Sequence, residues 1–118
     1  MYDLIDRPVR DLPPFERTVL LATRRWTHAL SLAGSAPLHI GGSAFSDVMT
    51  RLHDASRMTL VIRAPCHDAV DDAEAIIVNL WRLVRDGHTM QARRIAADLI
   101  GDASDGMLRA IRRAIPAL

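Results

Sequence analysis

The chain has 118 residues, among them 15 arginines, no lysine, 12 aspartates, two glutamates and one cysteine, and its formal net charge is +1. A chain of this length buries roughly two-thirds of its unfolded surface, so one domain with its own core is expected, and a hydrophobic content of 49% excludes disordered and fibrous classes. No apolar run reaches the roughly 18 residues of a membrane span, and charges interrupt the N-terminus, so we predict a cytoplasmic protein with neither a span nor a secretory signal.

Residues 1–12 carry alternating charges and show no sustained helical or strand periodicity. This pattern indicates an arm that becomes ordered by lying on the domain or on another subunit. The remaining residues, 13–118, are expected to form a single helical domain. Its first helix begins with two prolines and an acidic first turn, keeps its apolar residues at three- and four-residue spacing over 14–33, and ends at Gly34. A second helix is predicted over 44–55 from the same spacing.

Two segments between helices have the composition of short strands. Residues 38–40 alternate in polarity, and residues 57–64 are rich in β-branched and aliphatic side chains and are stopped by Pro65. Two strands alone are marginal, so they need helices packed over them or a second subunit that extends the sheet. The sequence leaves open whether they pair within one chain or between chains.

Three further helices complete a fold that we expect to be mainly α, with about five helices in one domain. The third begins at Asp68 or shortly after and ends at Gly87, and its apolar residues on all sides predict a central position. The fourth helix is predicted over 90–100 and the fifth over 106–115, again from their apolar spacing.

The densest polar cluster lies between the second strand-like segment and the third helix. Its candidate metal ligands are Cys66, His67, Asp68 and Asp72. Asp68 and Asp72 would share a helix face, but their spacing with Cys66 and His67 does not match a structural zinc site. Acidic residues also simply favour a helix N-terminus, so we expect helix capping here, with no metal and no cofactor. Cys66 is expected to be a small buried hydrophobe rather than a reactive thiol at a helix N-terminus.

The sequence lacks the catalytic signatures of phosphate loops, nucleophile elbows and zinc proteases, which favours a protein that is not an enzyme. The helix pair over 90–115 loosely resembles a helix-turn-helix, and its last helix carries Arg109, Arg112 and Arg113, so nucleic-acid binding is an alternative. Three aspartates near the turn and the low net charge count against it.

Part of the chain, residues 15–100, resembles a group of small helical alphaproteobacterial proteins of unknown function. The resemblance rests on an R-R-aromatic step at 24–26, an A-P-C step at 64–66 and an acid-rich helix start at 71–75. In that group further cysteines follow the first, whereas residues 67–68 here are His and Asp. The resemblance therefore implies a bacterial origin and no mechanism.

The function that we favour from the sequence is that of a small interaction or regulatory protein, as a homodimer or as an accessory subunit. Its partner-binding candidates are basic residues on the first and last helices. They are Arg17, Arg24, Arg25, His28, Arg109, Arg112 and Arg113. We expect the first four to form an exposed ridge on the first helix.

Overall fold

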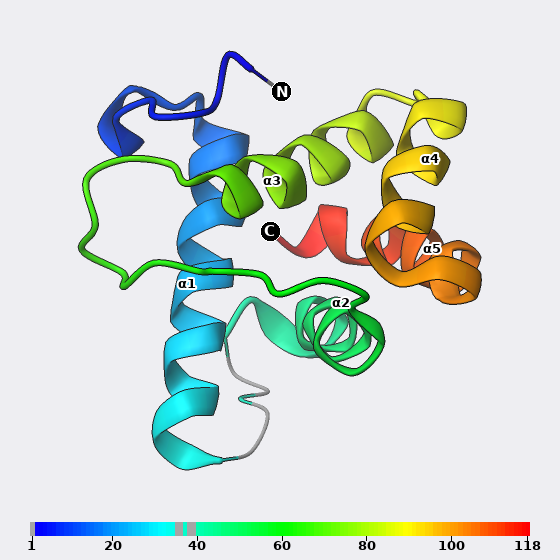
Figure 1. Cartoon of the computed structure of the whole chain (residues 1–118), viewed down its shortest axis with the longest axis horizontal. Coiled ribbons are helices and arrows are strands. Elements are labelled where there is room, and N and C mark those ends of the chain that lie inside the picture. Colours follow the sequence, from blue (N-terminus) through cyan, green and yellow to red (C-terminus); the bar gives the residue numbers. More distant parts are fainter. Residues whose placement is uncertain (1, 35–36, 38–39) are drawn as a thin grey trace.

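Five α-helices account for most of the residues that the computed structural model describes, which are 2–34, 37 and 40–118 (Figure 1). The helices are α1 (Pro14–Ala33), α2 (Gly42–Ala55), α3 (Asp72–Arg85), α4 (Thr89–Ile100) and α5 (Ser104–Ala114), and three single 3-10 turns are η1 (Val9–Asp11), η2 (Gly101–Ala103) and η3 (Ile115–Ala117). The mainly α class predicted from the sequence is confirmed, and so are the order and approximate positions of the helices.

The ends of α1 and the start of α2 follow from local backbone chemistry. Pro14 occupies the first turn of α1, where a missing N–H costs nothing, and Gly34 ends the helix in the left-handed region at φ 73°. Gly41, at φ 70°, turns the chain into α2 and lies so close to Phe45 that a Cβ atom there would come within 2.6 Å of the ring. Only glycine tolerates both conditions.

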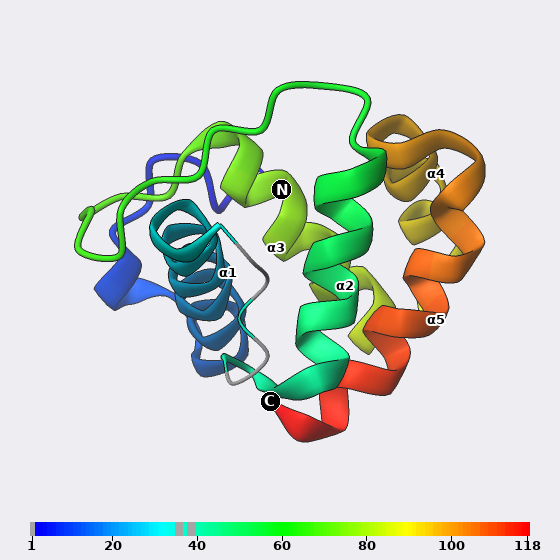
Figure 2. The same ribbon diagram turned by 90° about the horizontal axis from the view of Figure 1, so that it is seen from below.

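The third helix begins later than the earliest start that the sequence suggested. Asp71 caps it and forms a capping box with Glu74, whose side chain accepts a hydrogen bond from the Asp71 N–H at 3.0 Å. Helix α3 packs against α1, α4 and α5 (Figure 1). Helix α2 lies along α5 on the other side of the core (Figure 2). The ring of Phe45 in α2 stacks on Trp81 in α3, with 5.5 Å between their centroids.

The N-terminal arm lies on the rest of the same chain. The side chain of Leu4 is 0% exposed, and the backbone pairs with the segment before α3 through bonds from the Asp6 N–H to the Val70 oxygen (2.9 Å) and from the Val70 N–H to the Arg7 oxygen (3.0 Å). Asp3 forms an ion pair of 2.9 Å with Arg82 of α3, and these hydrogen bonds hold the pKa of the Asp3 carboxyl well below its usual range.

The prediction of a strand over 57–64 is wrong. After bends at Arg57 and Met58 the segment follows an extended path (Figure 1), but no ladder partner lies beside it in the described part of the chain, where the β-type pairing found is a single bridge between Pro8 and Ala69. Its β-branched residues favour an extended backbone, yet a strand also needs a second strand to bond with, and helices occupy the space around it. Of the other strand-like segment, residues 38 and 39 lie outside the described residues.

Candidate functional site

A buried ion pair links the middle of α1 to the start of α3. The Arg24 Nε donates to Glu74 Oε2 at 2.7 Å and its Nη2 donates to Oε1 at 2.9 Å, and both side chains are 0% exposed. The prediction that Arg24 belongs to an exposed ridge is therefore wrong. A charge is buried only when it is paired and its remaining hydrogen-bonding groups are satisfied, and Glu74 provides that pairing.

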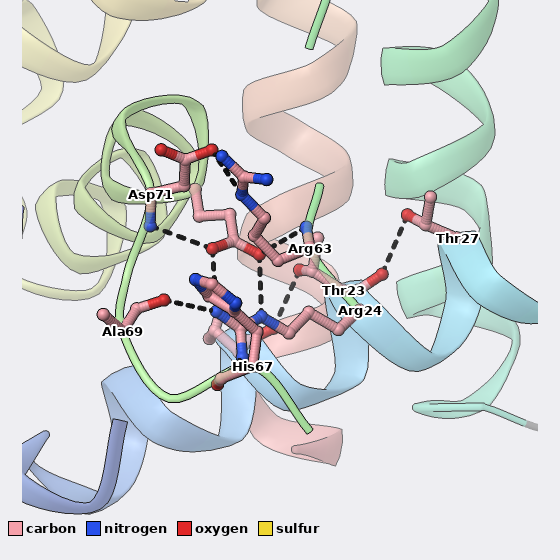
Figure 3. A network of polar contacts seen from close by, with 9 residues as sticks. Thr23, Arg24, Thr27, Arg63, His67, Ala69 and Asp71 are labelled. Atoms are coloured by element: carbon pink, nitrogen blue, oxygen red, sulfur yellow. Dashed lines mark hydrogen bonds and ion pairs between the residues drawn. The ribbon is translucent and has the colours of Figure 1, made fainter. Parts of the chain in front are cut away.

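The same pair holds the loop that precedes α3 (Figure 3). Arg24 also donates to the backbone oxygens of His67 (2.7 Å) and Ala69 (2.8 Å). Glu74 accepts the N–H of Arg63 at 3.1 Å, besides that of Asp71. Because both partners bind loop backbone as well as each other, residues 63–71 are fixed from beneath by two side chains of the core.

The predicted polar cluster is spread along the outside of this loop. Cys66, His67, Asp68 and Asp72 are all exposed. The burial expected for Cys66 is thus wrong, because it lies in a turn that no described element covers. The thiol also does not lie at a helix N-terminus, since α3 begins only at Asp72. Within the described residues no three His, Cys, Asp or Glu side chains are grouped closely enough to hold a metal ion.

The extended segment beside this loop is fixed at both ends. The Arg57 N–H donates to the Leu99 oxygen at 2.8 Å, and the Arg63 N–H donates to Glu74. Between these anchors the side chains alternate, because Leu60 and Ile62 pack against the core while Val61 is 50% exposed. In Figure 1 the segment crosses in front of α1, between α3 and α2.

A pocket of about 300 Å³ opens on the α2 side of this segment. Its wall is made of Trp26, Thr27 and Leu30 from α1, Met49, Leu52 and His53 from α2, and Ser56, Met58, Leu60 and Ile62 from the segment that follows. The Thr27 hydroxyl donates to the Thr23 oxygen (2.9 Å) and the Ser56 hydroxyl to the Met58 oxygen (2.7 Å), so these two polar groups are already engaged. Seven of its ten lining residues are apolar, and the pocket exposes polar and apolar surface in nearly equal parts.

Sequence reasoning missed this pocket. The spacing of Trp26, Met49 and Leu52 predicts inward-facing residues, and they are indeed buried, but they also line the pocket. The signal that could have indicated a pocket is Met58, an apolar residue at the start of a strand-like run without a partner.

The remaining basic candidates lie apart from the pocket, on two separate helix surfaces. On α1, Arg25 and His28 are exposed and Arg17 is half-buried. On α5, the three arginines are exposed and form no ion pair with any described residue. They are Arg109, Arg112 and Arg113.

One ion pair, between Glu16 and Arg85, links the start of α1 to the end of α3. Glu16 is buried and accepts a hydrogen bond from Arg85 at 2.9 Å, and the Arg85 guanidinium also covers the ring of Phe15 at 4.6 Å from its centroid. Arg85 further bonds Asp86 and lowers the pKa of that carboxyl. These contacts join the two helices, so we assign them to the fold.

Comparison of the chain with protein-family models, with curated proteins and with solved structures found no match. The resemblance of residues 15–100 to small alphaproteobacterial proteins thus stays a prediction. Among the described residues, no helix combines the length and apolar character that crossing a membrane requires.

Proposed function

We propose that this protein is an interaction module, without catalytic activity of its own, that binds a partner protein by taking an apolar side chain into the pocket between α1, α2 and residues 56–62. The observation that carries the proposal is the continuity of apolar surface there. Met58 belongs to the pocket wall and is itself 45% exposed, so apolar surface continues from the pocket onto the exterior. Apolar surface that continues from a pocket onto the exterior is typical of interaction sites.

The chemistry of the pocket favours binding over catalysis. His53 is the one ionisable side chain in its wall as described, and a catalytic site needs a second group to act with it. Met49 and Met58 supply flexible thioether side chains, which adapt to partner side chains of different shapes. A volume of about 300 Å³ is at the small end of ligand pockets and suits a single large side chain.

Filling the pocket tests this proposal. Peptides of twelve residues are selected from a random phage-displayed library against the immobilised full chain, and synthetic copies are titrated by fluorescence anisotropy. Thr27→Phe, which places a ring in the pocket, is expected to weaken binding at least about tenfold, or 1.4 kcal/mol.

Thr18→Phe is the matched control. Thr18 lies on the same helix, outside the pocket wall, and its hydroxyl makes the same kind of bond to the backbone oxygen four residues earlier as Thr27 does. The affinity of this variant should stay within about twofold of the unchanged protein. A library that yields no binding peptide, or peptides that bind both variants equally, would contradict the proposal.

A second candidate function is supported by the outer face of α5. Its three arginines are exposed and have no ion-pair partner in the described chain. Helix α5 follows α4 after the single turn η2. Asp105, the acidic residue closest in sequence to these arginines, lies in the first turn of α5 and pairs with Arg93 at 3.5 Å. Such a face suits phosphate groups of duplex DNA.

Binding to a random-sequence duplex in a salt series tests this second candidate. Replacing Arg109, Arg112 and Arg113 with alanine should reduce the slope of log K against log salt by about 1 for each arginine. Arg10→Ala and Arg25→Ala remove exposed arginines elsewhere and should leave the slope unchanged. Affinity that does not change with salt excludes this function.

A further inference from the structure

We infer that the partner segment adds to residues 60–63 as a β-strand, so that its backbone bonds to this edge while its side chain enters the pocket. The inference rests on the proposed function and names the form of its partner. Residues 57–64 have the composition of a strand, but in the structure no strand lies beside this segment in the described chain. A partner strand would supply the missing neighbour.

The backbone of the segment has one edge that is bound and one that is open. In an extended chain, N–H groups point alternately to opposite edges. The Arg63 N–H points toward Glu74, so those of Leu60 and Ile62 belong to the opposite edge. Backbone hydrogen bonds to other parts of the described chain are found at Arg57 but not at Leu60, Val61 or Ile62. The open edge therefore has donors and acceptors available to a second strand.

The open edge faces the pocket. Glu74 belongs to α3, whereas α2, which forms part of the pocket wall, lies on the other side of the segment, and α1 runs behind it (Figure 1). A strand that bonds to Leu60 and Ile62 would consequently run along the mouth of the pocket. Since side chains of a strand alternate between its two faces, every second side chain of the partner points toward the pocket floor.

The segment is already held in the conformation that strand addition needs. Its two ends are anchored to Leu99 and Glu74, and the side chains of Leu60 and Ile62 pack on the core. Binding therefore orders little additional backbone of this protein, which lowers the entropic cost of association. Main-chain bonds then supply affinity and the pocket supplies specificity, as in other cases of strand addition.

Charge determines the kind of partner. Residues 57–63 contain two arginines and no acid. Arg63 is paired with Asp71 at 2.9 Å, whereas Arg57 is exposed and has no ion pair among the described residues. The partner is thus an extended segment of another protein, with alternating apolar residues and an acidic residue that faces Arg57.

A second copy of this chain fits the edge less well. An antiparallel pair of two such segments centred on Leu60 would place Arg57 of each copy opposite Arg63 of the other. Like charges directly opposite each other destabilise a strand pair.

The experiment follows amide hydrogen exchange in the full chain by NMR, with and without a peptide selected as described above. At saturation, exchange at Leu60 and Ile62 should slow at least about tenfold, and exchange at Val61, on the other edge, should change little. The peptide is also made in two N-methylated forms, each modified at alternate residues. One form should lose affinity at least about tenfold and the other should retain it, because only one set of N–H groups faces the protein.

The possible outcomes separate this inference from the proposed function. Peptides that remain sensitive to Thr27→Phe but leave exchange at Leu60 and Ile62 unchanged overturn strand addition alone. The absence of any binding peptide overturns both proposals. Protection that appears without peptide and rises with protein concentration shows that a second copy occupies the edge, which overturns the foreign partner. Arg57→Ala should weaken binding of acid-containing peptides, whereas Arg10→Ala should not.

Discussion

Replacing Glu74 with glutamine is expected to lower the free energy of unfolding by about 3–5 kcal/mol, which is a large part of the stability of a small domain. The substitution keeps the shape of the side chain but leaves the Arg24 guanidinium buried without a counter-charge. This loss of stability is expected even if the intact Arg24–Glu74 pair contributes little net stability, because the substitution leaves the Arg24 charge buried without a partner. Urea denaturation followed by circular dichroism measures it.

Asp47→Asn is the matched control for this substitution. Asp47 also pairs with an arginine, Arg51, but both side chains of that pair are largely exposed, 40% and 45%. Solvent screens such a pair, so its loss should cost about 1 kcal/mol or less. Equal losses for the two variants would mean that Arg24 does not sit in a desolvated environment.

A double substitution separates charge burial from packing. Arg24→Met with Glu74→Met removes both charges and keeps apolar volume, and it should cost less than the two single substitutions added together. The oxygens of His67 and Ala69 lose their donor in this variant, so we expect some destabilisation to remain.

Replacing Leu4 with alanine should lower the free energy of unfolding by about 2–5 kcal/mol, although the residue is only the fourth in the chain. Leu4 is 0% exposed, so truncation removes buried apolar surface and leaves a cavity beneath the arm. Thermal and urea unfolding of the full chain measure the effect.

Tyr2→Ala is the control on the same arm. Tyr2 is larger than Leu4 but is 84% exposed, and its removal should change stability by no more than about 0.5 kcal/mol. If Leu4→Ala were equally mild, the arm would not be docked on the domain in solution, and its backbone bonds to residues 68–70 would not persist.

The buried pair also has a consequence for the proposed binding site. Glu74 accepts the Arg63 N–H and so fixes one end of the segment that lines the pocket. The buried ion pair of Arg24 and Glu74 therefore also positions the backbone of the segment that carries the open edge. A partner strand would meet an edge whose direction is set from within the domain.

The sequence by itself determined the helices of this protein. Helix position depends on side-chain spacing within a few turns and on local stop signals, and both are visible in one chain. The proline start and Gly34 end of α1, and the inward stripe of Met107 and Ile111 on α5, are of this kind. The extended character of 57–64 is local too, because β-branched residues favour it whatever lies nearby.

Only the tertiary structure decided which residues face one another. Arg24 looks like a surface residue until Glu74, 50 positions away, is brought beside it, and no spacing rule connects the two. The same holds for Cys66, whose exposure depends on what covers a turn, and for the pocket, whose wall combines α1 with α2 and the segment that follows it. Contacts between distant segments depend on how the helices pack, and periodicity along a single chain carries no information about that packing.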